Sequence, residues 1–216
     1  MAEMGVQNRN EDLVKRRSEQ ILSVARVIFA KNGYRRTTID DIANALSVGK
    51  GTIYRYFKDK KSLFLAVFGQ GIAQLHETFA QKVHPITDPP LKVETAVKTY
   101  FEFFDNNKDL IEIMMQVRSE FKEEHRRGFM TSYKDYIVRI QDNLRAGVEK
   151  GIFRDMDVEK TADAMSATLQ GVLQSYYVRE LEGDGEKQQG ETLAEKAEAV
   201  TALILNGLIK NNEEQS

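Results

Sequence analysis

Apolar residues recur along most of the chain at the spacing of an amphipathic helix. The clearest example is one apolar stripe of five residues at i, i+3, i+4, i+7 and i+8, namely Ile21, Val24, Ala25, Ile28 and Phe29. No stretch sustains the two-residue alternation of a half-buried strand. Breaks are few: all three prolines lie in "HPITDPP" (84–90), and a polar, glycine-rich stretch (181–191) predicts a loop. The pattern predicts an all-α fold.

The segment that follows Gly33 predicts two short helices joined by a tight turn. Gly33 stands where a helix C-terminal glycine belongs, and "TTIDDIANAL" opens with the capping-box-like pattern Thr38-Ile39-Asp40-Asp41. "SVG" then turns the chain, and "KGTIYRYF" resumes a helix with Ile53 and Phe57 facing inward. A longer first helix followed by two short ones is the helix-turn-helix plan.

The net charge of -2 is unevenly distributed along the chain. Residues 1–62 carry 13 Lys and Arg against 7 Asp and Glu, whereas the remainder carries 18 against 26. A small basic part joined to a larger acidic part favours one surface for a polyanion. Solvated surface charge alone would give the same division.

The outward face of the third helix is rich in groups that bind phosphate and base edges. It offers Lys50, Thr52, Tyr54, Arg55, Tyr56 and Lys58, with Lys60 and Lys61 just after. "GKGT" (49–52) resembles part of a nucleotide P-loop, but Lys50 is followed by Gly51, the upstream glycine position is Asn44, and helical spacing precedes it. The pattern favours a DNA backbone and groove over a nucleotide. The alternative is a solvated basic turn between core helices.

From about Arg17 to Phe68 the chain resembles the DNA-binding domain of the tetracycline-repressor (TetR) family. The resemblance rests on "F-x-x-x-G-Y-x-x-T-T", "I-D-D-I-A" and "K-G-T-I-Y-R-Y-F-K-D-K" followed by "L-F-L-A-V". It implies a third helix in the major groove, with base or phosphate contacts from Lys50, Gly51, Thr52 and Tyr54. It further implies backbone anchors at Thr38, Tyr56 and Lys58, and a variable, sequence-reading position at Arg55.

Two positions depart from the pattern of this family. Ser47 replaces the usual turn glycine, so a left-handed conformation there would carry a steric cost. Gly49 replaces the usual Ser or Thr that caps the third helix, and glycine is the weaker cap.

The acidic remainder predicts a helical ligand-binding and dimerisation domain. Its stretch "AVKTYFEFFDNNKDLIEIMMQVRSEF" is rich in Phe, Met and Tyr, which suits an adaptable apolar pocket, although most of these residues would equally form core. The candidate ligand-binding residues are Phe101, Phe104, Met114, Met115, Arg118, Phe121 and Tyr133. Arg118 would meet an acidic headgroup or form an ion pair.

The last two amphipathic segments resemble the dimerisation helices of the same family. The candidate interface residues are Met165, Leu169, Val172, Tyr176, Val200, Ile204 and Leu208. A purely intramolecular core is the alternative. A dimer is favoured because one helix-turn-helix reads only half a site.

The predicted domain plan is a disordered tail (1–14), a helix-turn-helix domain (15–62) and a ligand-binding and dimerisation domain (63–216). With no cysteine, no histidine pair at ligand spacing and a broken calcium-loop pattern from Asp105, we expect no metal and no cofactor. No signal peptide or membrane-length apolar run is apparent, which predicts a cytoplasmic protein.

The sequence therefore predicts a homodimeric repressor that a small apolar ligand releases from a near-palindromic DNA operator, and not an enzyme. Two alternatives stay open. One is a DNA-binding dimer without a small-molecule effector, and the other is a helical enzyme with an incidental basic N-terminal part.

Overall fold

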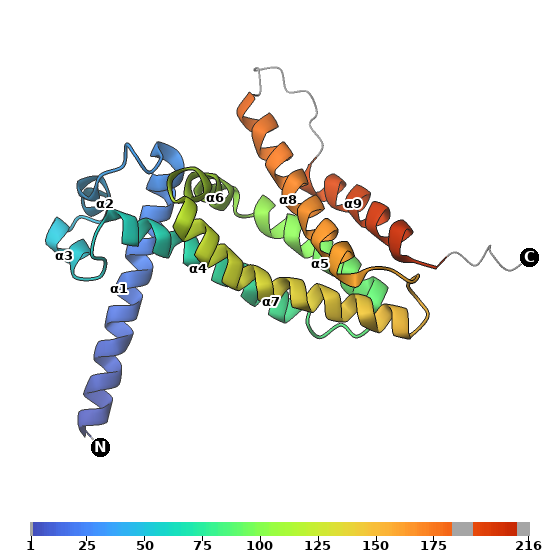
Figure 1. Cartoon of the computed structure of the whole chain (residues 1–216). Helices are drawn as coiled ribbons and strands as arrows, with labels where there is room; N and C mark the ends of the chain where they lie inside the picture. Colours follow the sequence, from blue (N-terminus) through green and yellow to red (C-terminus); the bar gives the residue numbers. More distant parts are fainter. Residues whose placement is uncertain (1, 183–191, 211–216) are drawn as a thin grey trace, which may run out of the picture. The chain divides into compact units, whose positions relative to one another are not determined.

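The structure is a computed structural model that describes residues 2–182 and 192–210, and within them the side chains outside 2–11, 122–133 and 180–182. Over these residues the regular elements are helices (Figure 1): α1 (Ala2–Asn32), α2 (Ile39–Ala45), α3 (Lys50–Tyr54), α4 (Lys60–Lys82), α5 (Pro89–Asp105), α6 (Lys108–Glu120), α7 (Lys122–Glu149), α8 (Val158–Glu182) and α9 (Leu193–Leu208). The all-α prediction is confirmed. Among the described residues, no helix has an apolar stretch that could cross a membrane.

Helix α1 begins at Ala2, where the sequence predicted a disordered tail over residues 1–14. No proline or capping signal interrupts the segment, so the helix that is buried at Ile21 extends without a break toward the N-terminus. Leu13 and Val14 remain more than half exposed, which means that tertiary packing does not stabilise this extension. The predicted loop 181–191 lies outside the described residues, apart from the end of α8 at Glu182.

The chain divides into two compact units. The first comprises Met1–Ala73 and Lys108–Lys122, and the second comprises Gln74–Asn107 and Glu123–Ser216. Helix α6 therefore packs in the first unit, although the sequence plan assigned everything after residue 62 to the ligand-binding domain. The boundary between two packed units need not separate two functions. The predicted boundary between the DNA-binding and ligand-binding domains, at residues 62 and 63, therefore stays a prediction.

The first unit is built on the predicted stripe of α1. Ile21, Ala25 and Phe29 are completely buried, and α1 packs against α2 and α6. Four aromatic rings meet at the end of α1. Their centroids lie 4.9 Å apart for Phe29 and Phe64, 5.0 Å for Tyr34 and Phe64, and 4.8 Å for Tyr34 and Phe121. These offset and edge contacts are favourable aromatic geometries.

The second unit is organised around α5, which packs against α8 and α9 (Figure 1). Asp88 caps α5 by accepting a 3.0 Å hydrogen bond from the Leu91 amide, and the two prolines that follow occupy the first turn, where no amide donor is needed. Phe101 and Phe104 are buried in this core, and burial raises the pKa of the Tyr100 hydroxyl far above its usual value.

Two backbone hydrogen bonds join the segment that follows α7 to the end of α9. The Arg154 amide donates to Leu208 O at 2.9 Å, and the Lys210 amide donates to Ile152 O at 3.2 Å. Between these bonds, the Phe153 side chain is 2% exposed and packs directly over Gly147 of α7. Glycine is required at position 147 because a Cβ atom there would overlap the Phe153 ring.

Substitution of Gly147 tests this close contact. Gly147→Ala is expected to lower the free energy of unfolding by about 1–3 kcal/mol, because an added methyl group overpacks the site beneath Phe153. Gly69→Ala in α4 is the matched control. Its Cβ would enter open space, so it is expected to stabilise the protein by about 0.5–1 kcal/mol through helix propensity. Denaturant unfolding measures both variants, and equal effects would contradict the contact.

Candidate nucleic-acid interface

Helix α2 begins at a complete capping box, as predicted. Thr38 Oγ1 accepts a 3.2 Å hydrogen bond from the Asp41 amide, and the Asp41 carboxylate accepts a 2.7 Å bond from the Thr38 amide. The Thr38 amide, together with the Thr38 hydroxyl that donates to the same carboxylate at 2.8 Å, lowers the pKa of Asp41 below its usual value. The Thr38 hydroxyl is thus part of the cap, and its role as a DNA backbone anchor stays a prediction.

The turn between α2 and α3 is a Schellman motif with serine in the left-handed position. The Ser47 amide donates to Asn44 O at 3.0 Å, and the Val48 amide donates to Ala43 O at 2.9 Å. Ser47 has a φ of 54°, the one positive φ outside glycine among the described residues. The left-handed conformation predicted at this departure from the family pattern is therefore confirmed.

Helix α3 is held to the first unit by its fourth residue. Ile53 is completely buried, whereas the residues on the other side of this five-residue helix are open to solvent. Gly49 caps α3 without a side-chain hydrogen bond, and its carbonyl accepts a 2.8 Å bond from the Thr52 amide. The weak cap predicted at this position is confirmed.

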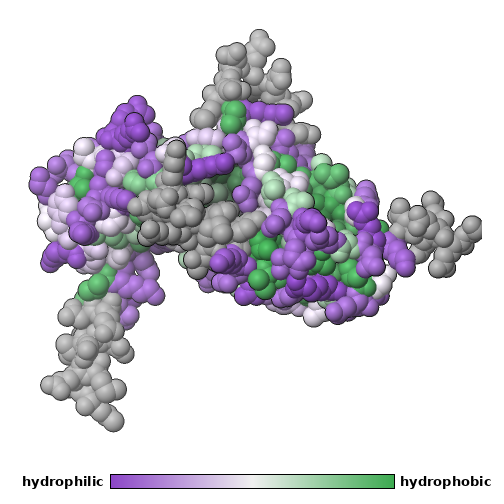
Figure 2. Space-filling view, in the orientation of Figure 1, coloured by the Kyte–Doolittle hydropathy of each residue, from purple (hydrophilic) through white to green (hydrophobic). Residues whose placement is uncertain are grey.

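The predicted DNA-binding residues lie together on and beside α2 and α3. Thr38, Lys50, Gly51, Tyr54, Arg55 and Lys58 are exposed, and Thr52 and Tyr56 are half-buried. Figure 2 shows mainly hydrophilic residues over the part of the surface where Figure 1 places α2 and α3. This face can contact phosphates through its cations and hydroxyls, and base edges through its longer side chains.

One ion pair lies on this face. Lys50 Nζ is 3.6 Å from Asp40 Oδ2, and both side chains are 62% exposed. A solvent-exposed pair of this kind contributes little to stability, so a phosphate can replace the carboxylate as the partner of Lys50 at small cost.

Lys60 and Lys61 follow the same sequence motif but have internal partners. Lys60 Nζ donates to Tyr34 O at 2.9 Å and to Thr37 O at 2.8 Å, and it lies 4.4 Å from the centroid of the Tyr34 ring. Lys61 Nζ lies 5.3 Å from the centroid of the Phe121 ring. Lys60 therefore joins the start of α4 to the turn after α1, and Lys61 lies over an aromatic ring directly after α6, so both lysines have partners within the first unit.

The predicted ligand-binding residues are divided between the two units. Phe101 and Phe104 are buried in the second unit, whereas α6 carries the half-buried Met114 and Met115 and the exposed Arg118 in the first. Phe121 belongs to the aromatic cluster of the first unit. The Tyr133 side chain lies outside the described residues. Phe121 therefore has a structural explanation that needs no ligand.

Most of the predicted dimer residues are covered by the chain's own helices. Leu169, Tyr176, Val200, Ile204 and Leu208 are at most 8% exposed, while Met165 and Val172 are half-buried. They form the contacts of α8 and α9 with each other and with α5. The larger apolar side chains face inward and form the intramolecular core. This core is the alternative to a dimer interface that the sequence left open.

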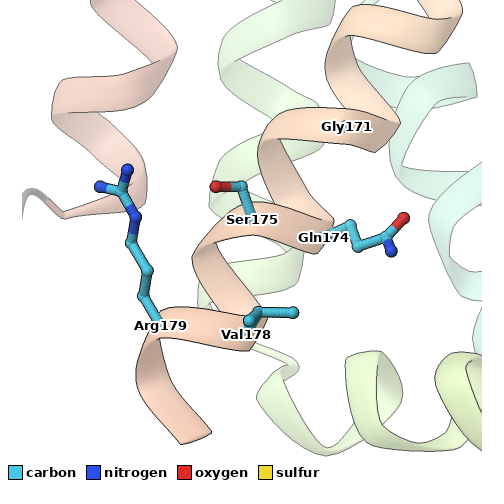
Figure 3. Close-up of a pocket in the computed structure, with 5 residues that line it drawn as sticks. All are labelled: Gly171, Gln174, Ser175, Val178 and Arg179. Carbon is cyan, nitrogen blue, oxygen red and sulfur yellow. The ribbon is translucent and has the colours of Figure 1, made fainter. Parts of the chain in front are cut away.

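The opposite face of α8 is exposed, carries small residues and contains a shallow pocket. Gly171, Gln174, Ser175, Val178 and Arg179 line a shallow pocket on two successive turns (Figure 3). On α9 the exposed residues include Leu203, which is 67% exposed. Figure 2 shows hydrophobic residues gathered where Figure 1 places α9. The sequence signal for this face was the run of small residues on α8, at Ala164, Ala167 and Gly171.

A helix-turn-helix whose third helix is held by a buried residue and exposes cationic side chains is typical of DNA-binding proteins. The family described as bacterial regulatory proteins, tetR family, matches residues 21–67, and the tetracyclin repressor-like C-terminal domain matches residues 87–176. The chain belongs to the TetR family of DNA-binding transcriptional regulators.

Relatives agree with this assignment along most of the chain. The fatty acid metabolism regulator protein of Bacillus subtilis is 20% identical over 190 residues, which cover 88% of this chain and 94% of the relative. The transcriptional repressor KstR2 of Rhodococcus jostii is 27% identical, covering 66% and 71%. A TetR/AcrR-family regulator from Thermobifida fusca has a similar structure, with a TM-score of 0.69, 26% identity and coverage of 88% and 97%.

The left-handed serine gives a stability prediction. Ser47→Gly is expected to raise the free energy of unfolding by up to about 1 kcal/mol, because glycine avoids the steric cost of a positive φ and loses part of that gain to its freer unfolded chain. Gly33→Ala, at a φ of 80°, is the control with the opposite sign. Chemical unfolding compares them, and a destabilised Ser47→Gly variant would contradict the strain.

Proposed function

We propose that this regulator is a homodimeric repressor whose two α3 helices enter successive major grooves of a near-palindromic operator. The observation that carries the proposal is α3 itself. Its buried Ile53 fixes the helix to the first unit, while Lys50, Tyr54 and Arg55 extend from the opposite side. Function on DNA would place the protein in the cytoplasm, and it requires no cofactor or catalytic step.

The exposed face of α8 and α9 supports the dimer. Small residues at Gly171 and Ser175 allow a second helix to approach closely, and Val178 and Leu203 supply apolar area that is 40% and 67% exposed. A symmetric dimer uses the same patch on both chains, which suits a self-complementary face of this kind. We therefore assign the dimer contacts to this face in place of the inward-facing residues.

A small apolar effector acting through the second unit is the regulatory part of the proposal. Two relatives carry names that connect them with apolar metabolites or with repression, the fatty acid metabolism regulator and the repressor KstR2. An effector of this class would lie beside the buried aromatic residues Tyr100, Phe101 and Phe104. An effector would shift the population between a DNA-binding and a released state.

Selection from randomised duplex DNA at about physiological salt tests the DNA-binding function, since affinity depends steeply on salt. Enrichment of a near-palindrome is the expected result, and weak, salt-sensitive binding without enrichment would reject an operator. The recovered operator then permits a screen of fatty acids and other small apolar compounds. A compound that raises the melting temperature and releases the operator supports the effector, whereas no shift across the panel favours a dimer without one.

Lys58 and Arg55 separate backbone contacts from base contacts. Lys58→Ala is expected to weaken binding to all sequences and to reduce the salt slope by about one, because one phosphate contact is lost. Arg55→Ala is expected to alter sequence preference at one operator position. Fluorescence anisotropy with operator and random duplexes at several salt concentrations measures both. Equal losses of Arg55→Ala on the two duplexes would remove its assignment to a base.

Leu203 tests the proposed dimer face. Leu203→Glu is expected to weaken the dimer at least about tenfold, equivalent to about 1.4 kcal/mol, because each chain would have to bury an unpaired carboxylate in the interface. Leu13→Glu, at a similarly exposed leucine of α1, is the control and should leave the dimer intact. Sedimentation velocity over a concentration series reads out the mass, and an unchanged Leu203→Glu dimer would place the interface elsewhere.

A further inference from the structure

Helix α6 packs with the first unit, although the chain on both sides of it belongs to the second. Residues 74–107 and those from Glu123 onward form the second unit, while Lys108–Lys122 packs against α1. Leu110, Ile113 and Val117 of α6 are completely buried in the first unit, and the Leu110 side chain lies directly over Gly71 of α4. Helix α6 is thus a structural part of the DNA-binding unit.

The side chain of Gln116 completes the end of α1. Its Oε1 accepts a 2.8 Å hydrogen bond from the Tyr34 amide, and its Nε2 donates a 3.1 Å bond to Phe29 O. Phe29 O also accepts the 2.9 Å bond from the Gly33 amide that ends the helix. One amide side chain therefore satisfies the Tyr34 amide, which follows the end of α1, and gives Phe29 O a second hydrogen bond.

Contacts on either side of Gln116 join α6 to α1 and to the turn that follows α1. Arg26 forms a bidentate pair with Asp109, with both nitrogen–oxygen distances at 2.6 Å and side chains that are 14% and 34% exposed. Planar pairs of this geometry orient both partners. The Arg35–Glu120 pair at 2.8 Å is different, since the Arg35 side chain is 81% exposed and contributes little.

The Tyr34 main chain is held from both sides. Gln116 of α6 binds its amide, and Lys60 of α4 binds its carbonyl at 2.9 Å. Three residues later Thr37 is completely buried, and Thr38 caps α2. The path from Tyr34 to α2, and through the Ser47 turn to α3, contains no long flexible segment, so the position of Tyr34 sets the position of the outward face.

We propose that Gln116 is a positioning residue for operator recognition, which holds Tyr34 so that α3 presents its side chains at the groove. The proposal rests on the proposed function, because it concerns the same DNA-binding face. Gln116 touches no DNA and acts through the backbone of Tyr34 and Phe29. The hydrogen bonds of α6 thereby contribute to sequence specificity from outside the predicted helix-turn-helix domain.

Positioning affects specific DNA more than random DNA. Base-edge contacts need a fixed orientation of α3, whereas phosphate contacts through long cationic side chains tolerate small rotations. Loss of Gln116 should therefore reduce operator affinity while non-specific affinity stays nearly constant. A residue that only stabilises the fold would change both affinities by the same factor.

The test uses Gln116→Met in the full-length protein, because methionine keeps the length of the side chain and removes both hydrogen bonds. Glu120→Gln is the matched control, one turn further along α6 on the exposed pair with Arg35. Operator and random-duplex affinities are measured for both variants and the unsubstituted protein at one salt concentration, about 20 °C below the lowest melting temperature. Hydrogen exchange at the Tyr34 amide is measured on the same samples.

We expect Gln116→Met to lose at least tenfold in operator affinity and less than twofold on random DNA, with faster exchange at Tyr34. Glu120→Gln should change neither affinity by more than twofold. Unchanged operator affinity, or equal losses on the two duplexes, in Gln116→Met would overturn the positioning role while the operator function stands. Failure of the unsubstituted protein to select any operator would instead reject the proposed function, and the positioning role with it.

Discussion

The placement of Tyr34, whose backbone is bonded by both Gln116 and Lys60, is the constraint on which the start of α2, and with it the packing of α3, depends. A five-residue helix such as α3 has no independent stability, because helix nucleation is costly and only tertiary packing offsets it. Its packing comes from Ile53 and from α2, whose N-cap residue, Thr38, lies four residues after Tyr34. Three helices meet at that residue, α1 through the preceding turn, α4 through Lys60 and α6 through Gln116.

The charge on the outward face of α3 depends on which partners the neighbouring carboxylates bind. Asp41 is bonded to the cap of α2, and Asp59 accepts a 2.7 Å bond from the Ser62 amide at the start of α4. Hydrogen bonds to these caps lower the pKa of both carboxyl groups. Their negative charges are directed at helix N-termini, where the dipole favours them. On the outward surface the Asp40 carboxylate lies near Lys50, and Arg55 and Lys58 add further positive charge.

In the second unit, α8 and α9 each have two distinct faces. The larger apolar side chains pack inward on α5, because a domain of this size needs them for its core. Small residues and a few exposed apolar ones remain on the other side, around Gly171 and Leu203. A helix that buries one face within the chain and leaves a second, close-packing face open is suited to pairing with another copy.

The sequence by itself determined the elements of the helix-turn-helix and the cap at which α2 begins, although α3 ends at Tyr54, three residues before the end of the predicted helix. The stripe from Ile21 to Phe29, the capping box at Thr38 and the left-handed Ser47 are local features, fixed by side-chain periodicity and by hydrogen bonds between residues a few positions apart. Only the tertiary structure decided that Lys60 faces inward, that α6 joins the first unit through Gln116, and which face of α8 stays open. These outcomes depend on contacts between residues up to 87 positions apart, and periodicity carries no information about which partner a helix face will meet.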